Sequence, residues 1–302
     1  MERAKPSSSA FARIIILGNS GFIGSSLQRY FRENLPQGVD VIGKNSAESD
    51  LTNEESVQKL AREFDEKTVV IMCSAIKRQR GEDTASCMAN ISMTMNLCRA
   101  LQDKPVGRFV YLSSTAVYGE DVHNVHITEQ TCPQPTSFYG IAKYTSELLL
   151  KKVFSNTPAR SLLILRPAVV YGSGEKIKIY GPSGFIRSAL DHEKITLWGD
   201  ATEKRDFISI DDLAAIIFKL TFAECSGPFN IATGTSHSFL EVLQVIERLA
   251  GHKLETDSRP RSKDKVDHAF DVTALKKHLP DFAFTDLTAG IGRNFRDEAK
   301  NA

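Results

Sequence analysis

The feature that most constrains the fold is a glycine-rich turn placed directly after a short apolar strand. Arg13–Leu17 is a continuous apolar run rich in isoleucine, and Gly18-Asn19-Ser20-Gly21-Phe22-Ile23-Gly24 follows it. Residues 22–33 then have the pattern of a helix. Glycines at such spacing let the backbone turn tightly and approach a pyrophosphate at a helix N-terminus, where N–H groups attract anions. The alternative is an ordinary strand–helix turn, but the order strand, glycine turn, helix favours dinucleotide binding.

Apolar strands and helices alternate along the chain as far as residue 172. The expected strands are apolar on both faces, which is typical of a parallel sheet covered by helices on each side. We therefore predict an α/β fold with a Rossmann-type doubly wound parallel sheet. Strands are expected at 13–17, 39–42, 68–73, 108–113 and 161–165. Helices are expected at 22–33, from a cap at Thr52 or Asn53, at 90–101 and at 140–154.

The alternation breaks after Gly172, which predicts a second domain. We expect a dinucleotide-binding domain over residues 11–172 and a smaller C-terminal α/β substrate domain over 173–302, some segments of which pack back on the first. In the second part, helices are expected at 211–222 and 238–251 and a strand at 229–231, while residues 255–268 are polar.

Composition excludes several classes of function. Lys and Arg number 38 against 37 Asp and Glu, so the chain lacks the basic excess typical of nucleic-acid partners. No apolar run approaches the ~18 residues that span a bilayer, and residues 1–10 have no apolar signal-peptide core. The five cysteines form no CxxC pair and suit reduced thiols in the cytoplasm. His123 and His126 make a poor zinc site and are interpreted as loop residues, so no metal is expected.

A second motif is Tyr139-Gly140-Ile141-Ala142-Lys143. Four residues apart on a helix, Tyr139 and Lys143 share one face, and an ammonium near a phenol favours the phenolate. Such a pair can act as a general acid or base on a hydroxyl or carbonyl. Upstream, the strand ending at Ser113-Ser114 delivers hydroxyl groups to the ligand-binding edge of the sheet.

The three motifs together resemble an extended short-chain dehydrogenase/reductase of the sugar-nucleotide epimerase/dehydratase/reductase group. They are GxxGxxG, Ser-Ser-x-x-Val-Tyr-Gly over 113–119, and YxxxK, and the resemblance covers about residues 12–290. It implies that Ser114, Tyr139 and Lys143 form the catalytic set, with a nicotinamide dinucleotide as cofactor and a nucleotide sugar as substrate. It also implies a homodimer formed through the helices at 90–101 and 140–154.

The end of the second expected strand bears on the choice of cofactor. NAD-binding relatives carry an acidic residue there for the ribose, whereas this chain has Gly43-Lys44-Asn45-Ser46. A cation suits the 2′-phosphate of NADP(H), so NADP(H) is favoured and NAD(H) is possible; alternatively, Lys44 is a solvated loop lysine. The expected cofactor-binding residues are Gly18, Ser20, Gly21, Phe22, Ile23, Gly24, Lys44, Asp50, Leu51, Ser74, Ala75, Lys77, Asn90, Tyr139, Lys143 and Pro167. For three of them there is a structural alternative: a capping Asp50, a solvated Lys77 and a helix-packing Asn90.

The resemblance also implies substrate-binding residues: Ser114, Thr115, Arg205 of the Arg-Asp-Phe segment, and Arg261, with Arg259 as a competing choice. Dehydratases carry Asp-Glu where this chain has Thr115-Ala116, which argues against dehydration. Val169 stands where many relatives have an asparagine that contacts the sugar. The leading hypothesis is an NADP(H)-dependent reductase of a 4-keto nucleotide sugar. The alternatives are a nucleotide-sugar 4-epimerase and, in another class, a non-catalytic dinucleotide-binding regulator.

Overall fold

The computed structural model describes residues 11–155, 161–175, 181–261 and 264–300. Its contacts divide the chain into two compact units. Among the described residues, unit 1 comprises the chain up to Gly119, Pro133–Arg166 and Ala214–Phe229, and unit 2 comprises Glu120–Cys132, Pro167–Leu213 and the residues from Asn230. Whether these units divide cofactor binding from substrate binding, as expected for 11–172 and 173–302, stays a prediction.

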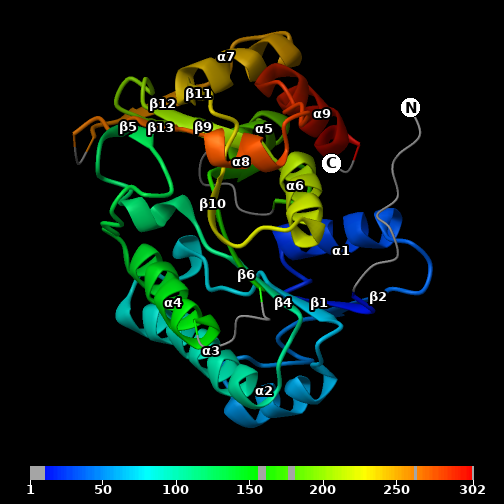
Figure 1. The fold of residues 1–302 in the computed structure, drawn as a ribbon. Helices are drawn as coiled ribbons and strands as arrows, with labels where there is room; N and C mark the ends of the chain where they lie inside the picture. The colour runs from blue at the N-terminus through cyan, green and yellow to red at the C-terminus, as the bar shows by residue number, and fades with distance from the viewer. Residues whose placement is uncertain (1–10, 156–160, 176–180, 262–263, 301–302) are drawn as a thin grey trace. The chain divides into compact units, whose positions relative to one another are not determined.

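Unit 1 is built on a six-stranded sheet in the order β10-β6-β4-β3-β1-β2 (Figure 1). The strands are β1 (Arg13–Leu17), β2 (Asp40–Lys44), β3 (Thr68–Met72), β4 (Arg108–Leu112), β6 (Ser161–Pro167) and β10 (Gly227–Ile231). The pairings from β6 through β4, β3 and β1 to β2 are all parallel. This confirms the doubly wound parallel sheet predicted from the apolar runs.

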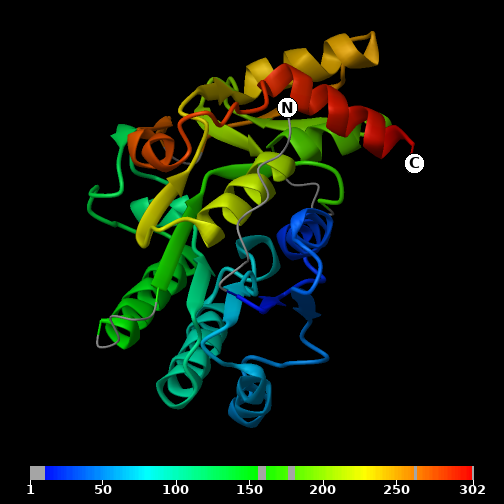
Figure 2. The same ribbon diagram turned by 45° about the vertical axis from the view of Figure 1, so that its right-hand side comes forward.

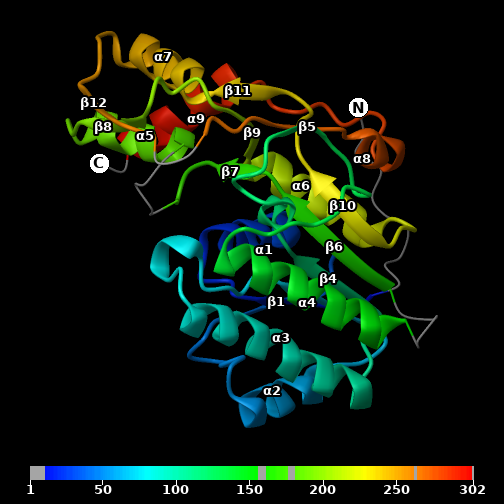
Figure 3. The ribbon, with the colours of Figure 1, turned by 90° about the vertical axis from the view of Figure 1, so that its left-hand side faces the viewer.

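Helices cover both faces of this sheet (Figure 3). On one face lie α1 (Phe22–Asn34) and α6 (Ile210–Phe222), joined by the rings of Phe31 and Phe218, whose centroids are 5.1 Å apart. On the other face lie α2 (Glu54–Leu60), α3 (Thr84–Asp103) and α4 (Phe138–Phe154). Because the inner strands β1, β3 and β4 are buried on both sides, their last four residues are apolar throughout rather than alternating.

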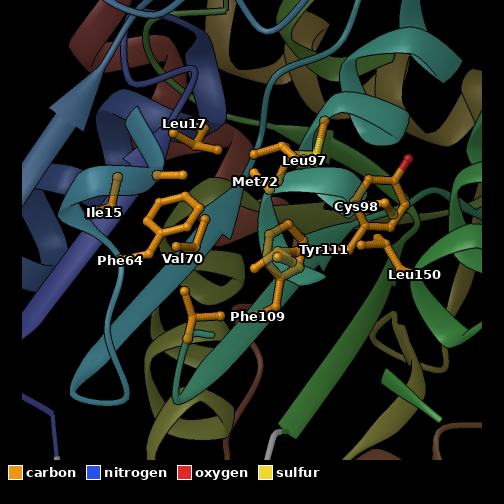
Figure 4. Packing of buried hydrophobic residues seen from close by; sticks show 14 of the residues in the cluster. Ile15, Leu17, Phe64, Val70, Met72, Leu97, Cys98, Phe109, Tyr111 and Leu150 are labelled. Atoms are coloured by element: carbon orange, nitrogen blue, oxygen red, sulfur yellow. The ribbon is translucent and has the colours of Figure 1, made fainter. Parts of the chain in front are cut away.

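The core under α2, α3 and α4 follows the two-residue period of the strands (Figure 4). Every second residue of β1, β3 and β4 points into it, and α3 and α4 supply the opposing side chains. Its members include Ile15, Leu17, Val70, Met72, Phe109, Tyr111, Leu97, Cys98 and Leu150, each no more than 4% exposed. Phe109, a member of this core, and Phe31, which packs against Phe218 on the other face of the sheet, are both fully buried.

Local capping explains where the helices of unit 1 begin. Asn53 accepts a hydrogen bond from the Ser56 N–H and starts α2, as expected. Asp83 forms a capping box with Ser86, so α3 begins at Thr84 rather than at the expected residue 90. Ser137 caps α4 through the Gly140 N–H.

Several strand ends differ from the expected residues, and β6, for example, runs to Pro167 rather than 165. The second strand runs over Asp40–Lys44 rather than 39–42, because its pairing with β1 continues to Leu17 opposite Lys44. Lys44 is therefore the last residue of the strand and not part of the following loop.

The described residues of unit 2 form three small sheets. They pair β7 (Val169–Tyr171) and β11 (Ser236–Ser238) with β9 (Lys204–Ser209), β8 (Ile195–Trp198) with β12 (Thr256–Arg259), and β5 (Asn124–Ile127) with β13 (His268–Phe270). The interpretation of His126 as a loop residue is wrong, since it lies in β5. The strand expected at 229–231 is the end of β10.

Helices of unit 2 pack on its central strands. Three of them, α5 (Gly181–Leu190), α7 (Phe239–Ala250) and α9 (Leu287–Ala299), contact one another, and α7 and α9 lie side by side in Figure 2. A short helix, α8 (Thr273–His278), precedes α9. Ser238 and the left-handed Gly251 cap α7 at the expected ends. Across the described ranges, the structure has no helix with the length and apolar character needed to cross a bilayer.

Candidate active site

The predicted cofactor and catalytic residues of unit 1 gather at one edge of its sheet. Gly18, Lys44, Ser74 and Ser114 lie at or just beyond the carboxyl ends of β1, β2, β3 and β4. Because these strands are parallel, their carboxyl ends meet at the same edge, where ligands bind in such sheets. The Gly18 N–H donates to the Lys44 carbonyl at 2.7 Å, so a hydrogen bond connects the end of β1 to the end of β2.

The glycine turn has a shape that only glycine permits. Gly18 has φ +85°, and a Cβ there would lie 2.8 Å from the Ser74 Oγ. A Cβ on Gly24 would lie 2.2 Å from the Gly18 carbonyl oxygen. Gly21 stands at the N-cap of α1 with no side chain to satisfy the first N–H groups, unlike the capped α2, α3 and α4. This open, cap-free helix start fits the pyrophosphate of a dinucleotide.

The loop after β3 approaches the same helix start. The Lys77 Nζ lies 5.6 Å from the centre of the Phe22 ring, so Lys77 packs against α1 rather than extending into solvent. Asn90 of α3 binds both backbone groups of Ile76, at 2.8 and 3.0 Å. Asn90 therefore fixes the loop that carries Ser74, Ala75 and Lys77, and its contact with a cofactor stays a prediction.

Lys44 forms an ion pair and is not a solvated loop lysine. Its Nζ lies 2.7 Å from the Glu63 Oε1, and both side chains are partly buried. The cation expected to meet a 2′-phosphate therefore shares its charge with a carboxylate. Further on, Asp50 accepts hydrogen bonds from the Thr52 hydroxyl and N–H, which lower the pKa of the Asp50 carboxyl, while Leu51 is buried.

The predicted catalytic residues come from two adjacent segments. Ser114 follows β4, and its hydroxyl accepts from the Ala116 N–H at the start of a 3₁₀ turn, Thr115–Tyr118. Tyr139 and Lys143 lie one turn apart on α4, with the Lys143 Nζ 5.7 Å from the Tyr139 ring centre. Lys143 donates to the Leu112 carbonyl at 2.6 Å, which attaches α4 to the end of β4. Ser114, Thr115 and Tyr139 are all half-buried.

Burial controls the electrostatics of Lys143. The side chain is 4% exposed, and desolvation lowers the pKa of Lys143 to about 8. Cys73 and Tyr111 lie close to it. Burial raises the pKa of the Cys73 thiol to about 12, and it also raises the pKa of the Tyr111 phenol. Both of these neighbours are therefore neutral near pH 7, and Lys143 is a cation in a largely apolar setting.

A buried ion pair beside this set was not singled out from the sequence. Glu147 of α4 and Arg166 of β6 are bonded through two contacts, at 2.9 and 2.6 Å, and neither is more than 2% exposed. The Arg166 Nη1 donates to the Tyr118 hydroxyl, and the Ser113 hydroxyl donates to Glu147. The signal was present, because Glu147 follows Lys143 by four residues and Arg166 interrupts an apolar strand.

The remaining predicted residues, Pro167, Arg205 and Arg261, belong to unit 2. Pro167 is buried at the end of β6. Arg205 donates from Nη1 to the carbonyls of Lys204 and Val266, and Arg261 pairs with Asp200. These contacts give both arginines a fixed position, and their contact with a substrate stays a prediction.

The contacts of Asp206, the residue after Arg205, hold a neighbouring segment of the chain in place. It is buried and accepts hydrogen bonds from Thr233 and the Gly234 N–H. Burial raises the pKa of Asp206 to about 6 despite these bonds. Asp206 thus fixes the segment around Thr233 and Gly234.

Two further expectations concern metals and oligomers. In the part of the chain that the structure describes, no group of three or more His, Cys, Asp or Glu side chains could hold a metal ion. The helices expected to form a dimer carry exposed apolar residues: Met88 of α3, and Phe138, Ile141 and Leu148 of α4. The homodimer stays a prediction.

Comparison with known proteins identifies the family. The chain is 27% identical over 247 residues to a GDP-6-deoxy-D-talose 4-dehydrogenase of Aggregatibacter actinomycetemcomitans, covering 80% of this chain and 82% of that one. It is 25% identical over 258 residues to a GDP-6-deoxy-D-mannose reductase of Pseudomonas aeruginosa, covering 82% and 83%. A Thermus thermophilus UDP-glucose 4-epimerase, solved in complex with NAD, superposes with a TM-score of 0.78 at 26% identity over 96% of this chain and 99% of that one. Residues 14–232 match the family model, so the chain belongs to the NAD dependent epimerase/dehydratase family.

Proposed function

We propose that the protein reduces the 4-keto group of a nucleotide-activated sugar, with NADP(H) as the favoured cofactor. Two relatives of this chain are named for chemistry on GDP-activated 6-deoxyhexoses, one as a 4-dehydrogenase and one as a reductase. A 4-dehydrogenase run backwards is a 4-keto reductase, so the two names describe related hydride transfers. The observation that carries the proposal is the buried Lys143 beside Tyr139, at the edge where the glycine turn lies.

The residues of the chain would share the chemistry as follows. A bound nicotinamide dinucleotide supplies the hydride. Tyr139 donates its phenolic proton to the oxygen that gains negative charge as the carbonyl is reduced. The Lys143 ammonium stabilises the resulting phenolate, and the Ser114 hydroxyl donates a hydrogen bond to the same substrate oxygen. Gly18, Gly21 and Gly24 hold the pyrophosphate of the dinucleotide at the start of α1.

Lys44 favours a reductase over a 4-epimerase. An epimerase returns its hydride in every cycle and benefits from retaining its dinucleotide, whereas a reductase releases the oxidised cofactor. The end of β2 carries Lys44 instead of an acidic residue for the ribose, which suits exchangeable NADP(H). The Thermus epimerase in complex with NAD keeps the 4-epimerase as the second candidate.

A non-catalytic regulator is the third candidate. Such a protein needs only to bind the dinucleotide and has no use for an acid or base. Keeping Lys143 buried costs stability, since burial disfavours its charged form. A perturbed lysine beside Tyr139 is therefore better explained by proton transfer than by binding alone.

One prediction concerns Arg205, the expected diphosphate ligand in unit 2. Arg205→Ala should raise the KM for a nucleotide sugar about tenfold or more, since losing a charge-assisted hydrogen bond costs ~1.5–3 kcal/mol. The affinity for NADPH should change little. The variant also loses the contact with the Val266 carbonyl, so its unfolding temperature must be measured alongside. A loss of cofactor affinity with an intact fold would remove Arg205 from the substrate site.

The proposed function is tested by following a deuterium atom. The purified protein is given a 4-keto nucleotide sugar and NADPH deuterated at the transferable position, and the product is analysed by mass spectrometry. A reductase transfers one deuterium to carbon 4 of each product molecule. An epimerase, given a 4-hydroxy nucleotide sugar in a parallel reaction, converts it to its 4-epimer without taking up the label, and a regulator leaves both sugars unchanged. Either of these two results would overturn the proposal.

A further inference from the structure

Glu147 connects the separate pieces of chain that carry the predicted catalytic groups. Its Oε1 accepts from the Ser113 hydroxyl at 2.6 Å and from the Arg166 Nε at 2.9 Å. Its Oε2 accepts from the Arg166 Nη2 at 2.6 Å. The carboxylate is fully buried, and every one of these donors is buried as well. Glu147 therefore holds α4, the end of β4 and β6 together at one point.

Each of these segments leads directly to a predicted catalytic residue. Ser113 precedes Ser114, so the bond to Glu147 fixes the backbone from which the Ser114 hydroxyl projects. Lys143 is one helical turn before Glu147 on the same face of α4, and Tyr139 is one turn earlier still. Arg166 extends the network to the Tyr118 hydroxyl, which ends the 3₁₀ turn that begins after Ser114.

We propose that Glu147 is a positioning residue for the Ser114, Tyr139 and Lys143 set, which it aligns through Ser113 and the buried ion pair with Arg166. The inference rests on the proposed function, because it takes these three residues as the reacting groups. It adds a role for a carboxylate that does not itself donate or accept the transferred proton. Bidentate geometry is well suited to this role, since it fixes orientation as well as distance.

The negative charge of Glu147 also acts on Lys143, one of the three predicted catalytic residues. The groups that face Lys143 are Cys73 after β3, Tyr111 and the Leu112 carbonyl of β4, and Tyr139 and Glu147 of α4. Cys73 and Tyr111 are neutral near pH 7 because burial raises the pKa of each. Glu147 is then the anion in this group that favours the ammonium form of Lys143. Removing its charge leaves Arg166 as an unbalanced cation nearby.

A purely structural role would predict something different. A buried ion pair of this kind stabilises a fold only weakly, yet removing one partner is strongly destabilising. If Glu147 only held the fold, its loss would lower the unfolding temperature, and the remaining folded molecules would react normally. A positioning role requires that the folded variant react slowly and with a changed pH profile.

The test is Glu147→Gln, which keeps the size of the side chain and removes its charge. In the folded fraction, kcat for reduction of a 4-keto nucleotide sugar should fall about 100-fold, since small misplacements of reacting groups cost that much. The affinity for NADPH, measured by fluorescence titration, should stay within about twofold, because the glycine turn is untouched. The alkaline limb of the kcat profile should move to lower pH by about one unit, because Lys143 loses its stabilising anion.

Two further variants keep the test decisive. Ser113→Ala removes a donor to Glu147 without leaving a charge unpaired, and should give a smaller loss of kcat with an unchanged alkaline limb. Arg108→Met is the matched control, because Arg108 is buried at the opposite end of β4 and binds carbonyls at the end of α6. It should lower the unfolding temperature and leave the pH profile of kcat unchanged.

The outcomes separate this proposal from the proposed function. If the wild-type protein does not reduce a 4-keto nucleotide sugar, the proposed function fails, and if Tyr139→Phe retains full activity, Tyr139 is not the proton donor. If Tyr139→Phe is inactive while Glu147→Gln keeps the wild-type kcat and pH profile, the positioning role of Glu147 fails and the function stands. Should Glu147→Gln not fold, a wild-type kcat for Ser113→Ala would overturn the proposal, and a reduced kcat with normal NADPH affinity would support it.

Discussion

Tyr139→Phe is expected to lower turnover of a 4-keto nucleotide sugar by ~10²–10⁴-fold, the usual contribution of general acid–base catalysis. The substitution removes the proton donor and keeps the ring that packs near Lys143, whose Nζ lies 5.7 Å from the ring centre. The measurement is the steady-state rate at saturating NADPH and sugar. It is accompanied by a titration of NADPH affinity, which should stay unchanged because the dinucleotide is held mainly by the glycine turn.

The control for this prediction is Tyr144→Phe on the same helix. Tyr144 lies one residue beyond Lys143, is half-buried and has no place in the proposed reaction. It should therefore turn over at the wild-type rate. Normal turnover by Tyr139→Phe, with its fold intact, would exclude Tyr139 as the proton donor.

Lys44→Asp is expected to weaken NADPH binding by tenfold to about 100-fold while NADH binding changes little. The estimate follows from a charge-assisted contact worth ~1.5–3 kcal/mol, which is replaced here by repulsion of the 2′-phosphate. The dissociation constants of both cofactors are measured by titration. An equal effect on the two cofactors would mean that Lys44 does not contact the 2′-phosphate of NADPH.

Because Lys44 pairs with Glu63, a substitution of Glu63 is expected to change NADPH affinity in the opposite direction to Lys44→Asp. Glu63→Gln removes the carboxylate that lies 2.7 Å from the Lys44 Nζ and leaves the ammonium available to a phosphate. It should raise the affinity for NADPH relative to NADH. Because Lys44→Asp places two carboxylates together, its unfolding temperature must be compared with that of Lys44→Gln, which should show the same selectivity in weaker form.

Much of unit 1 could be predicted from the sequence because local signals and tertiary structure agree there. The strand Arg13–Leu17, the turn at Gly18 and the helix from Phe22 have the predicted order and nearly the predicted bounds. Buried parallel strands are apolar throughout, which makes them visible in a single sequence. The start of α3 was placed too late because its first turn is held by the Asp83–Ser86 capping box and carries little apolar pattern.

Unit 2 was harder because its elements are short and their partners are distant in sequence. The strand Thr256–Arg259 is exposed along its length and pairs with β8, about 60 residues earlier, so no local pattern marks it. His126 was placed in a loop because the pairing of β5 with β13 joins segments more than 140 residues apart.

At the site, types of residue could be predicted but their contacts could not. The sequence shows that Lys44 is a cation at the end of a strand, yet its partner Glu63 comes from a 3₁₀ turn, Ala61–Glu63, that precedes β3. The same limit applies to Glu147 and Arg166, which are 19 residues apart and meet only after α4 packs on β6. Ion pairs between elements depend on the packing that brings them together.

The most direct test of the central claim is the absorbance of reduced nicotinamide during turnover. The purified protein is mixed with NADPH and a 4-keto nucleotide sugar, and the loss of the NADPH band is compared with the amount of sugar converted. A 4-keto reductase predicts a steady loss that equals the 4-hydroxy product formed, molecule for molecule. No loss of the band with the 4-keto sugar, together with interconversion of two 4-hydroxy sugars in a parallel reaction that starts from one of them, would contradict the account and identify a 4-epimerase instead.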